Sequence, residues 1–166
     1  MTSPFRIELL TSKHSRTSFS CGVDALDRYL REQASQDMRR RATSCYVAID
    51  SITSALAGYY TLAAAGIPLT DLPEHLVKKL PRYPSVPVAV IGRLAVDTAF
   101  QGKNIGAALL GNAIQRALRS EIAVAALVVI AKDEQAEAFY HHHNFLNFGS
   151  NPRQLILHLS GYRTLI

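Results

Sequence analysis

A glycine-containing segment in the second half of the chain has the composition of an anion-binding turn. Residues 101–107, QGKNIGA, lie between a predicted strand and a predicted helix. The first N–H groups of a helix have no partner within the helix, and the helix dipole makes this end positive. Gly102 and Gly106 allow the backbone to approach a phosphate closely, and Lys103 adds a positive charge. A short turn before a helix that packs tightly at Gly106 explains the same spacing equally well.

Two side chains have a chemistry that their surroundings do not explain. Tyr140 is a phenol that stays protonated at neutral pH, so it could act as a general acid. From the residues alone, a ring that packs beside Phe139 with its hydroxyl at the surface is the better interpretation of Tyr140. Arg93 interrupts an apolar strand, where an unpaired guanidinium is costly. We therefore expect a carboxylate, a phosphate or a substrate beside Arg93.

Other basic side chains could bind a polyanion. Arg39, Arg40 and Arg41 come at the end of a predicted helix, where positive charge is favourable by itself. Contact with nucleic-acid phosphates is the functional alternative for these three residues. Lys78 and Lys79 lie in a proline-bounded segment and could extend the same basic surface.

The histidines and cysteines do not predict a metal site. Neighbouring side chains on a helix point about 100° apart, so His141–His143 cannot converge on one ion. Cys21 and Cys45 form no CxxC motif, and neither has ligand spacing with His14 or His75. Both cysteines are expected to be free thiols in a reducing compartment.

Length and composition favour one globular domain covering 1–166. The chain has 166 residues, of which 48% are hydrophobic and 19% are charged, which excludes a disordered chain. The net charge of +5 is compatible with a polyanionic partner. No signal peptide is visible, and the longest apolar run, 122–131, is too short to cross a bilayer. We expect a cytoplasmic protein.

The alternation of strand and helix patterns predicts a layered α/β domain with a mixed sheet. Helical spacing of apolar residues begins at Asp24 and recurs in 105–118 and 133–143, with a short amphipathic piece at 74–80. The predicted strands are 5–10, 45–49, 56–65, 88–96, 123–130, 145–148 and 155–159.

Several motifs in this order resemble the GNAT acetyltransferases. The pattern Gln101-x-x-Asn104-x-Gly106 resembles the Q/R-x-x-G-x-G/A motif that binds the pyrophosphate of acetyl-CoA. The block GRLAVD at 92–97 with 101–110 resembles one branch, the TacT/AtaT-type toxins of type II toxin–antitoxin modules that acetylate aminoacyl-tRNA. Three further stretches resemble that branch: CGVDALDRYL at 21–30, GYYTL at 58–62 and AEAFY at 136–140.

The resemblance implies a GNAT fold, a mostly antiparallel central sheet flanked by helices in α/β/α layers. It implies acetyl-CoA as cofactor and Tyr140 as the general acid to the leaving thiolate. It also implies charged tRNA as substrate, a ribbon–helix–helix antitoxin and a homodimer. Cofactor binding is assigned to Leu94, Ala95, Val96, Gln101, Gly102, Lys103, Asn104, Ile105, Gly106, Ala107, Asp133, Ala136 and Phe139. Contact with tRNA is assigned to Arg93, Arg39, Arg40, Arg41, Lys78 and Lys79.

The chain departs from the family pattern at three positions. Asn104 and Asn144 stand where the family usually has glycine, and Asp133 stands where many members have asparagine. Asparagine is the residue besides glycine that best tolerates the left-handed conformation, so the backbone path can be kept. A carboxylate at Asp133 can still accept a hydrogen bond from the backbone.

Two other functions remain open. A GNAT enzyme that acetylates a small amine or a protein lysine would have an acidic patch beside its site. A non-catalytic GNAT-like domain that binds nucleic acid or a partner would have lost cofactor affinity, with Asn104 as the supporting feature. No glutamate or histidine stands out as a general base. The amine of an aminoacyl ester is less basic than that of lysine, so this gap fits the tRNA substrate.

Overall fold

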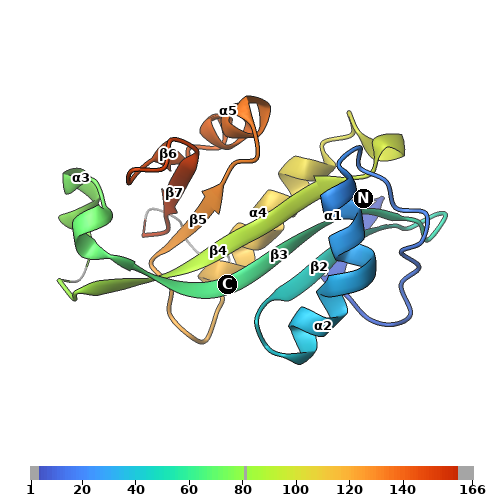
Figure 1. Ribbon diagram of the computed structural model, residues 1–166, viewed down its shortest axis with the longest axis horizontal. Helices are drawn as coiled ribbons and strands as arrows, with labels where there is room; N and C mark the ends of the chain where they lie inside the picture. The colour runs from blue at the N-terminus through green and yellow to red at the C-terminus, as the bar shows by residue number, and fades with distance from the viewer. Residues whose placement is uncertain (1–3, 81, 161–166) are drawn as a thin grey trace. The chain divides into compact units, whose positions relative to one another are not determined.

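The strands of the protein form a mixed sheet. The computed structural model describes residues 4–80 and 82–160, and the sheet has seven strands in the order β1-β2-β3-β4-β5-β7-β6 (Figure 1). The strands are β1 (Phe5–Leu9), β2 (Ser44–Asp50), β3 (Leu56–Pro68), β4 (Ser85–Val96), β5 (Ala126–Ile130), β6 (Leu146–Asn147) and β7 (Gln154–His158). The principal helices are α1 (Asp24–Arg28), α2 (Ala34–Arg39), α3 (Glu74–Val77), α4 (Ile105–Leu118) and α5 (Glu134–His142). This order confirms the predicted succession of elements.

The described residues group into two compact units. The first contains the residues up to Ala63 together with Gly92–Ala113, and the second contains Ala64–Ile91 and the residues from Ile114 onward. The single domain expected over 1–166 stays a prediction, and its residues 1–3, 81 and 161–166 lie outside the described part. Among the described residues, no helix combines the length and the apolar character needed to cross a membrane.

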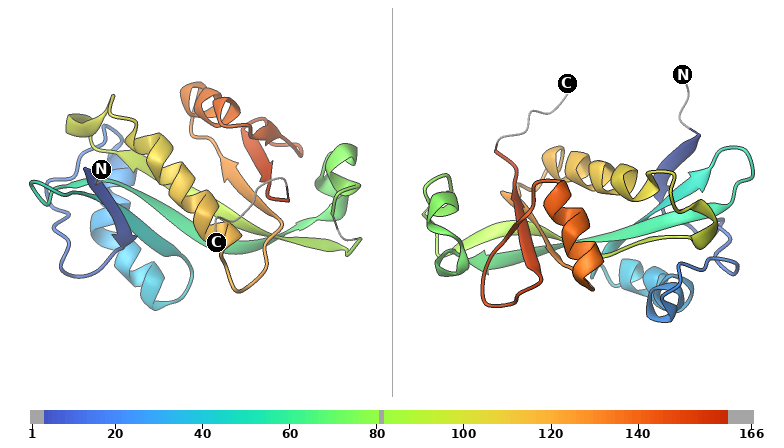
Figure 2. Two further views of the ribbon diagram at one scale, coloured as in Figure 1. Left: turned by 180° about the vertical axis from the view of Figure 1, so that it is seen from behind. Right: turned by 90° about the horizontal axis from the view of Figure 1, so that it is seen from above.

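In the first unit, β2 pairs antiparallel with both β1 and β3 (Figure 2). The register of β2 and β3 shifts between Ala48 and Ile49. Gly58 of β3 lies so close to its neighbours that an added Cβ would be 2.9 Å from the Ala95 carbonyl oxygen and 3.0 Å from Leu109. The GYYTL motif therefore begins with glycine because β3 and α4 pack closely at this point.

The predicted helix from Asp24 to the Arg39–Arg41 end is interrupted. A π-helical turn, η1 (Tyr29–Gln33), separates α1 from α2. A π turn adds a residue to the helical repeat, so it changes which later side chains lie beside earlier ones. Tyr29 and Leu30 are buried in this turn, as the apolar spacing predicts.

In the second unit, β5 pairs parallel with β4 from Val88↔Ala126 to Ile91↔Val129 and antiparallel with β7. The side chains of 126–129 are buried, and Ile130 is 56% exposed. The strand predicted over 123–130 is therefore shorter at its start and exposed at its end. A core of Leu76, Leu80 and Phe148 with several strand residues packs in this unit.

Two predicted boundaries in the second unit are wrong. β4 begins at Ser85 rather than at residue 88 and includes Pro87, whose carbonyl oxygen accepts from the Ala125 N–H. The helix expected over 74–80 ends at Val77. After that residue, the N–H groups of Lys79 and Leu80 bond to carbonyl oxygens three residues back, which is the tighter 3₁₀ pattern.

Candidate functional site

The turn before α4 presents a row of uncommitted backbone N–H groups. In the part of the chain that the structure describes, no amide from Gly102 to Ala107 donates a hydrogen bond, and the helical ladder begins with Ala108 N–H to the Asn104 oxygen at 3.1 Å. Asn104 has φ of 62° and Gly102 has φ of 82°. The expectation that Asn104 takes the left-handed conformation of the family glycine is confirmed. Such a row of N–H groups at a helix start is suited to a phosphate.

Lys103 and the open backbone add to the same turn. An added Cβ at Gly102 would meet no atom within 4 Å, so one side of the turn is open space. The Lys103 ammonium lies 5.3 Å from the centre of the Phe100 ring, and it contributes to lowering the pKa of the Asp50 carboxyl, after the hydrogen bonds that Asp50 accepts. The positive charge of Lys103 is thus near the turn but is not used in an ion pair that the described residues show.

Asp97 fixes the backbone at the start of this turn through its carboxylate, and sequence reasoning missed this residue. One carboxylate oxygen accepts from Ala99 N–H at 2.9 Å and the other from Ser20 N–H at 3.0 Å. An aspartate directly after a strand is a frequent N-cap, and this was the available signal. Gln101 donates from its side-chain amide to the Val96 carbonyl oxygen at 3.2 Å. The motif glutamine therefore fastens the turn to the end of β4.

The end of β4 contains the backbone assigned to the cofactor. Ala95 is buried, and Leu94 and Val96 are half-buried. The pairing of β4 with β5 covers Val88 to Ile91, whereas β4 itself continues to Val96. The first unit thus brings the predicted residues of 94–96 and 101–107 into one neighbourhood through Asp97 and Gln101.

Arg93 stacks on an aromatic ring, and within the described residues no carboxylate oxygen lies within 4.0 Å of it, so the expected phosphate or substrate stays a prediction. Its guanidinium carbon lies 3.5 Å from the centre of the Tyr29 ring. The Tyr29 hydroxyl donates to Asp37 Oδ2 at 2.7 Å, and Gln33 Nε2 donates to Asp37 Oδ1 at 2.9 Å. Sequence reasoning missed Tyr29, Gln33 and Asp37, although their spacing of four residues along a helix was a signal that they share a face.

The three consecutive arginines lie at the C-terminal end of α2 and are exposed. Arg39 ends the helix, Arg40 is its C-cap and Arg41 has φ of 59°. The hydrogen bonds from Gln33 and Tyr29 hold the pKa of the Asp37 carboxyl below its usual range, and the charges of Arg93 and Arg40 add to this. Arg93 and Arg40 therefore act on the same carboxylate. Favourable charge at a helix end explains Arg39 and Arg40 without a ligand.

In the second unit, Asp133 begins α5. Its Oδ1 accepts from Ala136 N–H at 2.8 Å, so the carboxylate caps the helix and Ala136 supplies the capped amide. Asp133 thus makes the backbone contact expected of it. Phe139 is half-buried one turn further along.

Tyr140 is held in place at the end of the same helix. The residue is 5% exposed, and its ring contacts Phe139 and Phe145 edge to face at 5.2 and 5.3 Å between centres. Burial raises the pKa of Tyr140 above its usual value, so the phenol keeps its proton at neutral pH. The packing beside Phe139 is confirmed.

The C-terminus of α5 explains the residues after Tyr140. Asn144 has φ of 73°, its N–H donates to the His141 oxygen, and Phe145 N–H donates to the Tyr140 oxygen at 3.1 Å. These two bonds with the Phe145–Tyr140 ring contact are a Schellman motif, in which glycine is usual and asparagine is tolerated. Asn144 therefore keeps the family backbone path, as expected.

The histidines at this helix end make separate contacts. His141 Nε2 lies 2.6 Å from Asn147 Oδ1, whereas the His143 ring contacts Phe139. Within the described ranges, no group of three or more His, Cys, Asp or Glu side chains could hold a metal ion. Within the described residues, Cys21 and Cys45 form no disulfide, and burial raises the pKa of Cys45 to about 12.

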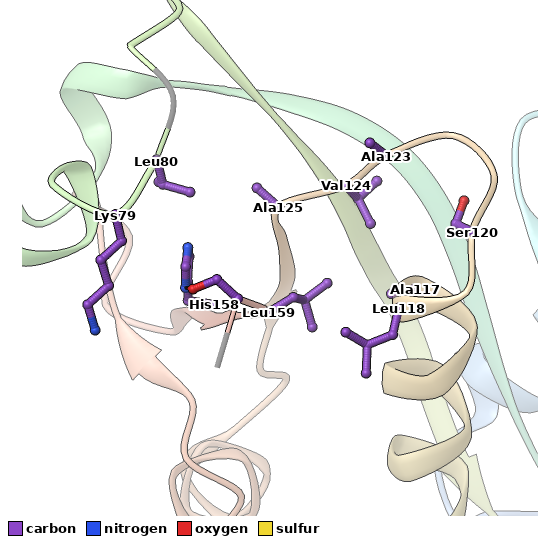
Figure 3. A pocket seen from close by; sticks show the side chains of 11 residues that line it. Lys79, Leu80, Ala117, Leu118, Ser120, Ala123, Val124, Ala125, His158 and Leu159 are labelled. Atoms are coloured by element: carbon purple, nitrogen blue, oxygen red, sulfur yellow. Dashed lines mark hydrogen bonds between the residues drawn. The ribbon is translucent and has the colours of Figure 1, made fainter. Parts of the chain in front are cut away.

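Lys78 and Lys79 are exposed residues after α3 in the second unit. Lys79 lines a hollow of about 380 Å³ together with Leu80, Leu118, Val124 and His158. The side chains of Lys79 and His158 lie beside each other there (Figure 3). Of the predicted site residues, Lys79 alone is among those that line this hollow, so the hollow is not the candidate site.

Comparisons with known proteins agree with the motifs. The acetyltransferase (GNAT) family matches residues 12–145. The tRNA-acetylating toxin of Mycobacterium tuberculosis is 34% identical over 152 residues, which cover 90% of this chain and 89% of the relative.

Solved structures resemble the chain over nearly its whole length. AtaT complexed with acetyl-methionyl-tRNAfMet has a TM-score of 0.86 and 27% identity and covers 95% of this chain and 96% of its own. AtaTR bound with acetyl-CoA has a TM-score of 0.80 and 27% identity, with 95% of each chain covered. A Tyr-to-Phe mutant of the AtaT toxin bound to the C-terminus of the antitoxin AtaR has a TM-score of 0.79 and 25% identity, with 96% of each covered.

The motifs, the strand order and the turn before α4 agree with these similarities, and the predicted GNAT fold is confirmed. The chain belongs to the acetyltransferase (GNAT) family, in the branch that includes the TacT/AtaT-type toxins.

Proposed function

We propose that this protein is an acetyl-CoA-dependent N-acetyltransferase toxin that acetylates the α-amino group of aminoacyl-tRNA and thereby blocks translation. The observation that carries the proposal is the similarity to a tRNA-acetylating toxin along nine-tenths of the chain. The solved relative that contains acetyl-methionyl-tRNA supports the same reaction, because an acetylated aminoacyl-tRNA is its product.

The residues of the first unit fit acetyl-CoA. Its pyrophosphate requires N–H donors and positive charge, and the turn from Gly102 to Ala107 offers uncommitted amides with Lys103 beside them. The backbone of Leu94, Ala95 and Val96 is proposed to bond to the pantetheine amides. When bound, acetyl-CoA supplies the acetyl group as a thioester.

Tyr140 is proposed to donate its proton to the thiolate that leaves. The phenol is buried and its pKa is raised, so it stays protonated at the pH of the cell. The ring contacts and the Schellman motif hold it in a fixed position. Backbone N–H groups at the end of β4 are proposed to polarise the thioester carbonyl.

The basic residues are proposed to contact the tRNA backbone. Arg93 is the strongest candidate, followed by Arg39–Arg41 and then by Lys78 and Lys79. As a partner we propose a ribbon–helix–helix antitoxin, because a solved relative that matches over 96% of each chain is bound to the C-terminus of an antitoxin. We also propose that two copies of this chain form a homodimer. Because charged tRNA is the substrate, we place the protein in the cytoplasm.

The test compares charged with deacylated tRNA. The protein is incubated with radiolabelled acetyl-CoA and each tRNA preparation, and label in the tRNA is counted before and after alkaline hydrolysis of the aminoacyl ester. We expect label on charged tRNA only, released by hydrolysis as an N-acetyl amino acid. A protein that binds coenzyme A but transfers no label to any charged tRNA contradicts the proposal.

A further inference from the structure

The Arg93 guanidinium is backed by an aromatic ring. The guanidinium carbon of Arg93 lies 3.5 Å from the centre of the Tyr29 ring, which is the distance of a stacked contact. In the part of the chain that the structure describes, its N–H groups donate no hydrogen bond and no carboxylate oxygen lies within 4.0 Å. The side chain is half-buried, so the ring replaces part of the water around the charge.

The Tyr29 ring cannot turn away from Arg93. It is 6% exposed and stacks on Tyr59 at 6.4 Å with an angle of 15° between the rings. Its hydroxyl is bonded to Asp37, and Asp37 is bonded on its other oxygen by Gln33. The helix residues and Tyr59 thus fix the plane of the ring from two sides.

This arrangement allows the Arg93 guanidinium to bind an anion. The carboxylate of this network, Asp37, accepts its hydrogen bonds from Tyr29 and Gln33 rather than from the guanidinium. A planar guanidinium with unused N–H groups matches two oxygens of a phosphate, and a desolvated cation gains most from such a charge-assisted bond. Arg40 acts on the same carboxylate, so the surroundings of Arg93 contain a second positive charge.

We propose that Arg93 binds a backbone phosphodiester of the tRNA acceptor end and that Tyr29, fixed by Asp37, is the positioning residue that holds the guanidinium plane. The proposal rests on aminoacyl-tRNA as substrate. It assigns to Tyr29 and Asp37 a role in tRNA binding that neither residue type indicates by itself.

The experiment measures the KM for charged tRNA, the KM for acetyl-CoA and the binding of deacylated tRNA at several salt concentrations. Arg93→Gln should raise the KM for charged tRNA about tenfold and leave that for acetyl-CoA unchanged. The slope of log K against log salt should fall by roughly 0.7 to 1, the value for one lost phosphate contact. Arg28→Gln, which removes an exposed arginine paired with Asp24, should change neither KM nor slope.

A double-mutant cycle separates positioning from folding. Tyr29→Leu should raise the KM for tRNA about threefold in the wild-type background and have no further effect beside Arg93→Gln. Tyr29→Phe keeps the ring but loses the hydrogen bond to Asp37, so its KM should lie between those of the wild type and Tyr29→Leu. An effect of Tyr29→Leu that persists in the Arg93→Gln background overturns the positioning role. If Tyr29→Leu does not fold, Arg93→Lys, which keeps the charge and loses the planar fork, should still raise the KM severalfold.

Failure of this inference differs from failure of the proposed function. If no charged tRNA is acetylated but the salt slope falls in Arg93→Gln, the phosphate contact stands and the reaction is wrong. If charged tRNA is acetylated and Arg93→Gln leaves the KM and the slope unchanged, the phosphate contact is wrong.

Discussion

The substitution Asn104→Ala tests the anion-binding turn through a backbone angle. Asn104 has φ of 62°, and an L-residue other than asparagine, aspartate or glycine costs about 1 kcal/mol more in this conformation. If the alanine keeps this angle, the folded protein loses that amount of stability. If the turn relaxes to negative φ, the amides from Gly102 to Ala107 change direction, and coenzyme A must restore them when it binds.

The free energy lost in Asn104→Ala therefore lowers the melting temperature, raises the dissociation constant for coenzyme A, or is divided between these two effects. About 1 kcal/mol corresponds to roughly a fivefold weaker affinity or to a melting temperature about 2–4 °C lower. Calorimetric titration with coenzyme A and thermal unfolding of the same samples measure both. Asn104→Gly should bind within about twofold of the wild type, because glycine takes this angle freely.

Asn144→Ala is the matched control, since Asn144 also has positive φ, at 73°, but follows the end of a different helix, α5. It should lower the melting temperature and leave coenzyme A affinity unchanged. If Asn104→Ala changes neither affinity nor stability, the reasoning about this turn is refuted.

Three further predictions concern Tyr140, Cys45 and Asp37. Tyr140→Phe should lower kcat by roughly 10²-fold or more, the range for a general acid, while titration shows unchanged coenzyme A binding; a kcat equal to the wild type excludes the acid role. Because burial raises the pKa of Cys45 to about 12, Ellman's reagent should modify one thiol per native chain and two after unfolding, and rapid reaction of both contradicts that burial. The pKa of Asp37 is lowered from 3.8 on folding, so its ionised form adds stability above that pH, and this stability is lost as the pH falls through the lowered pKa. In a plot of melting temperature against pH, Asp37→Asn should therefore flatten the acid side. An unaltered plot rules this contribution out.

The sequence predicts best where a pattern is local. The helix α4 spans the predicted 105–118, because its apolar residues recur at helical spacing over several turns. The left-handed angles at Asn104 and Asn144 followed from the family glycines at these positions together with the conformational preference of asparagine. Strand ends were less accurate: β4 begins at Ser85, and the proline at 87 had favoured a later start.

The sequence predicts least where partners are distant in the chain. The ring under Arg93 comes from Tyr29, and no local pattern relates two residues so far apart, so the sequence did not indicate this contact. The π-helical turn at Tyr29–Gln33 also has no proline or glycine to indicate it. The apolar spacing did identify Tyr29 as buried, but the use of its hydroxyl depends on Asp37 beyond that turn.

The most direct test of the central claim is one reaction with competing acceptors. The protein is given acetyl-CoA, a mixture of charged tRNAs and a lysine-containing peptide, and mass spectrometry identifies where the acetyl group is found. We predict N-acetylated aminoacyl-tRNA and an unmodified peptide. Acetylation of the peptide with unmodified aminoacyl-tRNA would contradict the account.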